Sequence, residues 1–469
     1  MQPSIFNKVV PLAGRDDIFL MNTFTDAQLV VSRDVVDLLD RVGTTPNLAG
    51  TLDDTERSAL RDLIEHGFIV KDRATERKAL NRFFHDVRED TSELRLTLLT
   101  TLQCNFACDY CFQGDHGDYN LRAEKMSMAT AHRLCEWLEM KLDELGSSQF
   151  SLTFFGGEPL LNQPVMFETA ERLWRATQDR GVEMRTNVIT NGLLLTPEVV
   201  DRLEPFGLDG FKITLDGDPQ THDRMRPLRG GQGTFDRIIE NVRRVAHRCN
   251  ITVGGNFDED TVDSYPALLD FLAAQDFADS LVQVSFKPIV REKPTTLPPG
   301  FIPLTAVGGD NKPLGGTCMS SAGSGAGSAC DSCNLLDTKM SYLREETKKR
   351  GFATMDGVHM GPCDIHRRHA YTVGPDGSLY ACPGFTGQPT AATGHINGEL
   401  EEHHRRAAAD FDSLAAWKSC GDCAFIPVCA GGCSVAAHSE LGTMHKPSCH
   451  KESMESALVS FAEEAATQM

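Results

Sequence analysis

An α/β fold built on a partial barrel of parallel strands is predicted by three observations. Segments of strand character alternate with segments of helical character between residues 91 and 290, which is typical of βα units. Glycines and polar residues follow the expected strand ends, where barrels of this kind carry their chemistry. Cysteines gather after the first of these strands and again towards the end of the chain, which predicts a separate cysteine-rich domain.

The barrel strands are expected to be six segments rich in β-branched and aromatic residues. The helix expected after the first strand has Ser127 at its N-cap and ends at Gly146. Its Leu134, Leu138 and Leu142 recur every four residues, which is the spacing of a buried face. Six βα units in a row predict a partial (β/α)6 barrel of the TIM type. The expected strands cover residues 94–100, 150–156, 183–190, 210–216, 251–257 and 281–289.

Residues 1–90 are expected to form a small winged-helix-like domain. Two short strands are predicted within residues 18–33, followed by a helix for which Ser32 is the N-cap. A second helix is expected between Asp53 and Gly67, and another strand directly after it. These helices carry no row of lysine and arginine residues along one face, so DNA binding is not expected.

Length, charge and the N-terminal sequence exclude several classes of protein. A chain of 469 residues exceeds one ordinary hydrophobic core, so two or three domains are expected. A net charge of -20 argues against nucleic-acid binding, which needs a basic surface. No apolar run is long enough to predict a membrane span. The N-terminus lacks the apolar core of a signal peptide, so we expect a cytoplasmic protein whose clustered cysteines serve metal or redox chemistry.

The first cysteine cluster is Cys104, Cys108 and Cys111, spaced C-x3-C-x2-C on one loop. Three such thiolates can bind three irons of a 4Fe-4S cubane and leave the fourth iron without a protein ligand. A disulfide interpretation is poor, because three cysteines cannot pair among themselves. A zinc site would need a fourth ligand, for which His116 is the near candidate.

With Tyr110 between its last two cysteines, this spacing resembles the cluster motif of the radical S-adenosylmethionine (radical SAM) superfamily, C-x3-C-x-aromatic-C. The resemblance implies that the open iron chelates the amino and carboxylate groups of S-adenosylmethionine. It also implies a low-potential electron donor, such as flavodoxin or ferredoxin. The chemistry would be a 5′-deoxyadenosyl radical that abstracts a hydrogen atom from the substrate.

Further polar motifs follow the second, third and fourth expected strands: residues 156–159 (GGEP), 190–192 (TNG) and 214–217 (TLDG). By the resemblance, Tyr110 contacts the adenine, and Gly157 with Glu158 contacts the methionyl amino group. Thr214 and Arg226 are assigned to the carboxylate or the ribose, although a surface ion pair is the alternative for Arg226. The predicted cofactor-binding residues are Tyr110, Gly157, Glu158, Asn191, Thr214 and Arg226.

Residues 291–340 are rich in proline, glycine and serine and are predicted to be a linker. This linker nevertheless contains Cys318, Cys330 and Cys333. They are candidate metal ligands, for example the missing ligand of a downstream cluster. A redox pair is the alternative, because C-x2-C is also a dithiol spacing.

The second cysteine array lies within residues 341–469, and its seven cysteines resemble the SPASM domain that follows many radical SAM barrels. A zinc ribbon is the competing interpretation. The resemblance implies two auxiliary 4Fe-4S clusters, of which the second lacks a fourth protein ligand. The implied ligand sets are Cys420, Cys423, Cys429 and Cys449 for one cluster, and Cys363, Cys382 and Cys433 for the other. Cys135 and Cys249 are then expected to be core residues.

The function that this resemblance favours is modification of a ribosomally made precursor peptide, by a thioether or carbon-carbon crosslink or another oxidation. Residues 1–90 would then bind the leader of that peptide against a sheet edge, and the alternative is a domain that merely packs on the barrel. The first alternative is an anaerobic sulfatase-maturing type of enzyme, against which Pro383 counts, because such enzymes carry an aspartate directly after the cysteine that corresponds to Cys382. The second alternative is an iron-sulfur electron carrier or redox sensor.

Overall fold

The computed structural model describes residues 1–45, 48–111, 124–289, 331–355, 358, 361–398 and 400–468. The chain divides into two compact units, each built from stretches that are distant in sequence. The terminal unit comprises Met1–Glu89, Asp356–His366 and Leu414–Met469. The barrel unit comprises Asp90–Met355 and Arg367–Ser413.

The barrel unit contains a sheet of nine strands in the order β11-β10-β9-β8-β7-β6-β12-β13-β14. The six strands from β6 to β11 follow one another in sequence and pair in parallel, so the predicted partial barrel is confirmed. Their bounds differ by at most two residues from those expected. They are β6 (Glu93–Leu99), β7 (Gln149–Phe155), β8 (Glu183–Thr190), β9 (Leu208–Thr214), β10 (Asn250–Phe257) and β11 (Leu281–Pro288).

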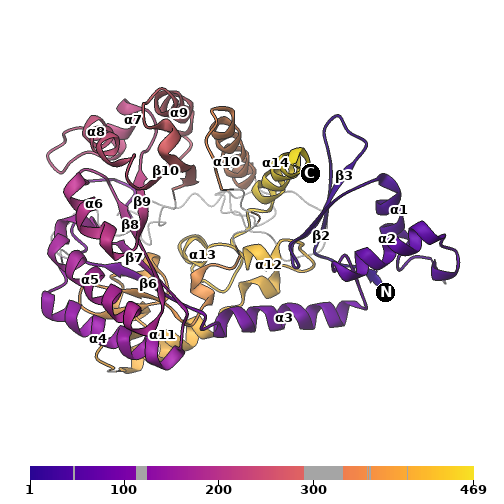
Figure 1. The fold of residues 1–469 in the computed structure, drawn as a ribbon, viewed down its shortest axis with the longest axis horizontal. Helices are drawn as coiled ribbons and strands as arrows, with labels where there is room; N and C mark the ends of the chain where they lie inside the picture. Colours follow the sequence, from indigo (N-terminus) through magenta and orange to yellow (C-terminus); the bar gives the residue numbers. More distant parts are fainter. Residues whose placement is uncertain are drawn as a thin grey trace, which may run out of the picture. The chain divides into compact units, whose positions relative to one another are not determined.

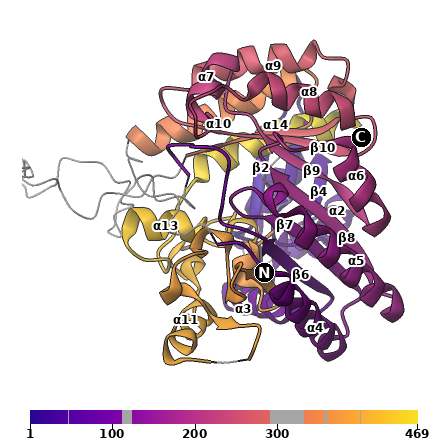
Figure 2. The ribbon, with the colours of Figure 1, turned by 90° about the vertical axis from the view of Figure 1, so that its left-hand side faces the viewer.

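Helices of the barrel unit lie along the outer side of this sheet (Figure 1, Figure 2). As expected, the first of them begins after Ser127, whose hydroxyl accepts a hydrogen bond from the Thr130 N–H. It ends at Gly146, which adopts the left-handed conformation with φ 63°. The helices are α4 (Met128–Leu145), α5 (Gln163–Arg180), α6 (Pro197–Leu203), α7 (Pro219–Met225), α8 (Phe235–Val245), α9 (Tyr265–Ala273), α10 (Asp331–Lys349) and α11 (Glu402–Asp412).

The two faces of the barrel sheet differ in polarity. Along β9, Phe211 and Ile213 are buried in the core with the helices, whereas Lys212 and Thr214 alternate to the opposite side. We call this opposite side the inner face. Leu99, Phe155 and Ile189 also lie on this face by register, but many of its positions on the other strands are polar. Among them are Thr97, Thr153, Asn187, Thr252, Asn256, Gln283 and Lys287.

The C-terminal region contributes to both units. Strand β12 (Ala370–Val373) pairs in parallel with β6 and is followed by β13 (Ser378–Tyr380) and β14 (Gly394–His395). These strands extend the barrel sheet beyond the six that were predicted. Residues 341–469 are thus shared between the two units, and helix α10 begins inside the stretch that was expected to be a linker.

The terminal unit contains a three-stranded antiparallel sheet in the order β2-β3-β4. The two strands and two helices expected in residues 18–67 are present, and Asp53 forms a capping box with Glu56 at the start of the second helix. Strands β1 and β5 form a separate antiparallel pair. Bounds are β1 (Gln2–Pro3), β2 (Asn7–Pro11), β3 (Ile18–Asn22), β4 (Ala27–Val31), α1 (Arg33–Arg41), α2 (Asp54–Glu65), β5 (Ile69–Val70), α3 (Arg73–Glu89), α12 (Ile426–Cys429), α13 (Ser434–Leu441) and α14 (Lys451–Gln468).

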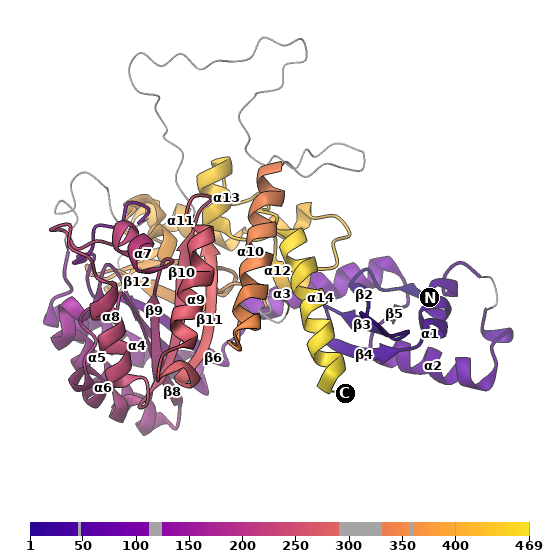
Figure 3. The same ribbon diagram turned by 90° about the horizontal axis from the view of Figure 1, so that it is seen from above.

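Both faces of this three-stranded sheet are covered (Figure 3). Leu20 packs with Leu38 and Leu63, which brings α1 and α2 against one face. Phe19 packs with Leu458 and so brings α14 against the other. No helix in the described part of the chain is both long enough and apolar enough to cross a bilayer.

Candidate functional site

The loop that follows β6 carries Cys104, Cys108 and Cys111 and is fastened to the loop after β7. The Gly157 N–H donates to the Thr101 carbonyl at 3.0 Å, and the Glu158 N–H donates to the Gln103 carbonyl at 2.8 Å. A Cβ at Gly157 would lie 2.2 Å from the Gln103 oxygen. The glycine is therefore required for the approach of this loop to the cysteine loop, and not only for the approach to a ligand that the sequence suggested.

A second attachment holds the middle of the cysteine loop against the segment after α7. The Ala107 N–H donates to the Pro227 carbonyl at 2.9 Å, and the Arg229 N–H donates to the Asn105 carbonyl at 3.2 Å. The cysteine loop is thus held between the loop after β7 and the segment that follows β9 and α7. This fixes the cysteines at the carboxyl ends of the barrel strands, as predicted.

Cys108 is buried, and Cys104 and Cys111 are partly buried. Burial raises the pKa of Cys108 to about 12, and it raises the pKa of Cys104 to about 11 with a further contribution from Glu158. Such thiols become thiolates when a metal binds them. The Asn191 amide nitrogen lies 3.8 Å from the Cys104 sulfur and donates to the Asn105 side-chain oxygen at 2.7 Å, which brings Asn191 to the cysteines.

Glu158 is fully buried and joins the loop after β7 to the loop after β8. Its carboxylate accepts from the Thr190 hydroxyl at 2.8 Å, the Asn191 N–H at 2.8 Å and the Leu160 N–H at 3.0 Å. Burial raises the pKa of Glu158, and these donors oppose the rise. The carboxylate therefore positions two loops of the site. Its predicted contact with the methionyl amino group stays a prediction.

Tyr110 is the centre of a polar network that the sequence did not predict. Its hydroxyl donates to Asp216 and accepts from Arg226 Nη1 at 2.5 Å and from the Asn256 amide nitrogen at 3.3 Å. Asp216 also accepts from the Asn256 N–H at 2.7 Å and lies 3.5 Å from Arg226 Nη1. Burial raises the pKa of Asp216, and the charge of Arg226 opposes that rise. The network ties the cysteine loop to the ends of β9 and β10.

Arg226 is an internal residue of the site. It is 9% exposed, so the alternative of a surface ion pair is wrong. Its Nε is buried and has no hydrogen-bond partner among the described residues. Its guanidinium carbon lies 5.6 Å from the centre of the Phe106 ring. An unsatisfied donor on a buried cation suits an anionic ligand such as a carboxylate.

His222 and Asp223 hold the backbone around this network by hydrogen bonds. His222 Nδ1 accepts from the Asp216 N–H at 3.1 Å, and Nε2 lies 3.1 Å from the Thr234 hydroxyl. Burial lowers the pKa of His222 well below its usual value, so the ring is neutral and carries its proton on Nε2. Asp223 accepts from the Thr234 and Phe235 N–H groups at 2.7 and 2.9 Å.

Thr214, the last residue of β9, is half-buried on the inner face beside Gly254.

Four cysteines of the second array are close enough to interact within the terminal unit. Burial raises the pKa of Cys420 to about 12, and Cys429, Cys423 and Cys449 add to that rise. Cys363 and Cys433 also belong to the terminal unit and interact electrostatically. Cys382 belongs to the barrel unit, so the second predicted ligand set draws on residues of both units.

The described cysteines form neither disulfides nor a site for a single metal ion. No disulfide joins cysteines whose side chains the structure describes. Within the same residues, no three His, Cys, Asp or Glu side chains converge on a point where one metal ion would sit. A cubane presents its irons at separate corners, so its thiolates need no such convergence. Cys135 is fully buried and Cys249 packs against the core, as expected, while Cys318, Cys330 and the Cys333 side chain lie outside the described residues.

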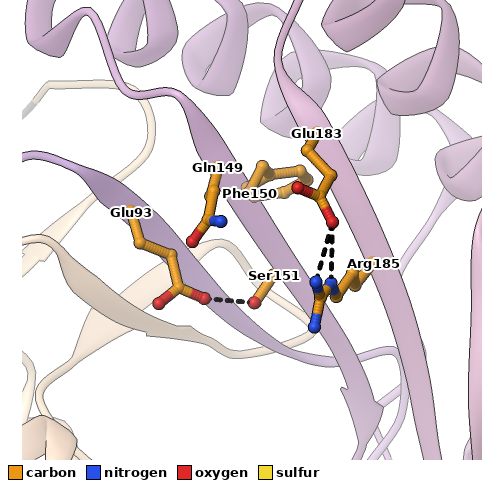
Figure 4. A pocket seen from close by; sticks show the side chains of 6 residues that line it. All are labelled: Glu93, Gln149, Phe150, Ser151, Glu183 and Arg185. Carbon is orange, nitrogen blue, oxygen red and sulfur yellow. Dashed lines mark hydrogen bonds and ion pairs between the residues drawn. The ribbon is translucent and has the colours of Figure 1, made fainter.

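A pocket of about 170 Å³ lies at the opposite, amino ends of β6, β7 and β8 (Figure 4). Arg185 donates two hydrogen bonds to Glu183 there, at 2.8 and 3.0 Å, and Ser151 donates to Glu93. These polar groups satisfy one another. Since the cysteines lie at the carboxyl ends, this pocket is separate from the candidate site.

Residues 98–272, from β6 into α9, match the model of the Radical SAM superfamily. The chain contains a radical SAM domain. Enzymes with this domain use a 4Fe-4S cluster and S-adenosylmethionine, and the cysteines, the GGEP loop and the Tyr110 network all lie inside the matched residues.

Curated relatives match only part of this chain. A GTP 3′,8-cyclase of Synechococcus is 31% identical over 32% of this chain and 41% of its own length. A PqqA peptide cyclase of Ruegeria pomeroyi is 34% identical over 28% of this chain and 31% of its own length. The radical SAM cyclopropyl synthase TigE of Paramaledivibacter caminithermalis is 22% identical over 45% of this chain. The chain spans less than half the length of each of these relatives.

Among solved structures, native anSMEcpe with bound AdoMet superposes with a TM-score of 0.55 at 15% identity. The match covers 80% of this chain and all of that chain. A structure of the same protein with AdoMet and the Cp18Cys peptide gives a TM-score of 0.54. At 15% identity the likeness establishes the fold only. Because the superposition covers 80% of this chain, the likeness extends beyond the barrel strands.

Proposed function

We propose that this protein is a radical SAM enzyme that modifies a ribosomally made peptide. The observation that carries the proposal is the cysteine loop, which is held between the loop after β7 and the segment after α7 and is joined to Arg226 through Tyr110. When bound, the cluster and S-adenosylmethionine supply a 5′-deoxyadenosyl radical that removes a hydrogen atom from the substrate. The modification would be a thioether or carbon-carbon crosslink, or another oxidation.

The residues present fit these groups. Cys104, Cys108 and Cys111 would hold three irons, since three thiolates leave one iron for S-adenosylmethionine. The unsatisfied Nε of Arg226 suits the methionyl carboxylate, and Tyr110 keeps that guanidinium in place. Gly157, Glu158, Asn191 and Thr214 complete the proposed cofactor site. The burial of Cys108 and the partial burial of Cys104 and Cys111 would limit the access of water to it.

A peptide substrate is supported by the relatives and by the terminal unit. The names of the PqqA peptide cyclase and of the anSMEcpe complex with a peptide both refer to peptides. Strand β4 is the last strand of the order β2-β3-β4, so one of its edges has no partner among the described strands. A leader peptide could add to that edge by backbone hydrogen bonds. A low-potential donor such as flavodoxin or ferredoxin would supply electrons.

Auxiliary 4Fe-4S clusters complete the proposal. Cys420, Cys423, Cys429 and Cys449 would hold one, and their mutual electrostatic influence on pKa supports this set. Cys363, Cys382 and Cys433 would hold the other, with a fourth position that is open to substrate or filled by a thiol of Cys318, Cys330 or Cys333. These clusters would accept the surplus electron of an oxidative modification or anchor a substrate sulfur.

Reductive cleavage of S-adenosylmethionine by anaerobically reconstituted protein tests the radical chemistry. Replacing Cys104, Cys108 and Cys111 together by alanine should abolish cleavage and lower the iron content from about twelve to about eight per chain. The matched control is Cys249→Ala, because Cys249 lies outside all proposed ligand sets. This variant should keep both the cleavage activity and the iron content. Cleavage that survives the triple replacement would refute the assignment.

Incubation with each short peptide that open reading frames next to the gene encode tests the substrate class. A crosslink removes hydrogen, so mass spectrometry should show a peptide of lower mass that forms only with S-adenosylmethionine and reductant. A protein that cleaves S-adenosylmethionine but leaves every such peptide unchanged is not a peptide maturase.

A further inference from the structure

A pair of lysines on the inner face of the barrel sheet has no role in the proposed cofactor chemistry. Lys212 lies on β9 between Phe211 and Ile213, which are buried on the helix side, so the lysine points to the inner face. Its side chain is half-buried and crosses Gly254 of the neighbouring strand, where a Cβ would lie 3.0 Å from Lys212 Cε. The glycine makes room for the lysine.

Lys287 shares this face with the candidate site. It is the register partner of Asn256 across β10 and β11, and partners in a parallel pair point to the same side of a sheet. The Asn256 side chain reaches Tyr110, so the face that bears the lysines also bears the cofactor network. Lys212 precedes Thr214, at the end of β9, by two residues. The lysines thus lie along the wall of the barrel that leads up to the proposed cofactor site.

Among the residues that the structure describes, the two lysines lack the carboxylate partners that other cations of this sheet have. Arg185 on β8, for example, pairs with Glu183 at 2.8 Å. Within the described ranges, neither Lys212 nor Lys287 forms an ion pair. Burial and the nearby charge of Lys287 lower the pKa of Lys212 to about 8. Lys212 is half-buried and Lys287 is exposed beside it. In a chain of net charge -20, two neighbouring lysines without an ion pair to any described residue indicate a place for an anion.

We propose that Lys212 and Lys287 bind a carboxylate of the substrate peptide, namely the side chain of an aspartate or glutamate close to the residue that is modified. The inference rests on the proposed function, because it takes the substrate to be a peptide. The carboxylate of S-adenosylmethionine is not the proposed ligand here, since Arg226 is already assigned to it under the proposed function. A carboxylate between two ammonium groups would fix the peptide's register along the inner face and so select the residue that faces the cofactor.

Acetylation of the full-length reconstituted protein with acetic anhydride tests the subsite without turnover. The probe is N-acetylglutamate α-amide, and its matched control is the uncharged N-acetylglutamine amide. The probe should slow labelling of Lys212 by about fivefold or more, while the control and the exposed Lys71 show no change, as read by mass spectrometry. Equal labelling of Lys212 with both compounds would overturn the proposal.

Turnover of the precursor peptide provides the second test. Lys212→Met should raise the KM for the peptide by about tenfold with a smaller change in kcat, and Lys212→Arg should restore most of the loss. The exposed control Lys71→Met should change neither constant. Replacing the critical peptide carboxylate by its amide should raise KM for the wild-type enzyme but not further for Lys212→Met.

The outcomes separate this inference from the proposed function. The subsite is refuted if the effect of Lys212→Met on KM adds to the effect of every aspartate and glutamate replacement in the peptide. Coupling to the peptide's C-terminal carboxylate alone would refute its assignment to a side chain. A protein that leaves peptides unmodified refutes the proposed function, whereas the labelling of Lys212 still decides whether a carboxylate binds there.

Discussion

At the scale of single residues, the site depends on side chains that connect the loops of several strands by hydrogen bonds. Tyr110 was expected to contact adenine, and the structure adds three polar partners: two at the ends of β9 and β10 and one at the end of α7. Asn256 and Asp216 belong to this network although the sequence assigned them no role. The available signal was their place at strand ends, because GGNF ends β10 as TLDG follows β9. Which of these polar groups meet could not be read from their spacing.

Tyr110→Phe should therefore destabilise the barrel unit. The change removes one hydroxyl and leaves Asp216 and Arg226 short of a partner, for which the cost is about 1–3 kcal/mol. Urea denaturation followed by the fluorescence of Trp137 and Trp174 measures it.

The matched control for this change is Tyr371→Phe, whose ring packs edge-on against Trp137 and whose hydroxyl lies outside the network. If the two phenylalanine variants lose the same stability, the Tyr110 network does not hold the site together.

At the scale of elements, the loops after β6 and β7 act as one unit. Backbone groups of Gly157 and Glu158 donate to carbonyls of the cysteine loop, so the position of the cysteines depends on a neighbouring strand's loop. The resemblance assigned Gly157 to a contact with the methionyl amino group. The structure adds a second reason for a glycine there, because the space beside Gly157 is taken by the Gln103 carbonyl.

Gly157→Ala should displace the cysteine loop. The new Cβ would lie 2.2 Å from the Gln103 oxygen, and overpacking of this kind costs about 1–3 kcal/mol. We expect lower iron content after reconstitution and weaker cleavage of S-adenosylmethionine, measured by iron analysis and product chromatography. Gly50→Ala is the control, since nothing lies within 4 Å of a Cβ at that position. Iron content that is equal in both variants would contradict this account.

At the scale of the whole molecule, neither compact unit is a continuous stretch of sequence. Helix α14, at the C-terminal end, packs in the same core cluster as Phe19 and Met21 of β3. The N-terminal sheet therefore depends on residues from the other end of the chain. Amphipathic patterns revealed that each segment has an apolar face but not which distant segment covers it.

Leu458→Ala should destabilise the terminal unit by about 2–5 kcal/mol, because Leu458 is 1% exposed and its truncation leaves a cavity against Phe19. The neighbouring Val459 is 45% exposed, and Val459→Ala should change stability by less than about 0.5 kcal/mol. Hydrogen exchange of the β2 and β3 amides reports the difference. Equal protection in both variants would show that α14 does not stabilise the sheet.

The sequence by itself determined the order of the barrel strands, the helix that begins at Ser127 and the place of the first cysteines. These features are local, because periodicity, capping residues and short spacings act over a few neighbouring residues. Only the tertiary structure decided that β12 extends the barrel sheet, that α14 covers the N-terminal sheet and that Tyr110 meets Arg226. Such contacts depend on which complementary surfaces come together in three dimensions, and many pairings are compatible with one sequence pattern.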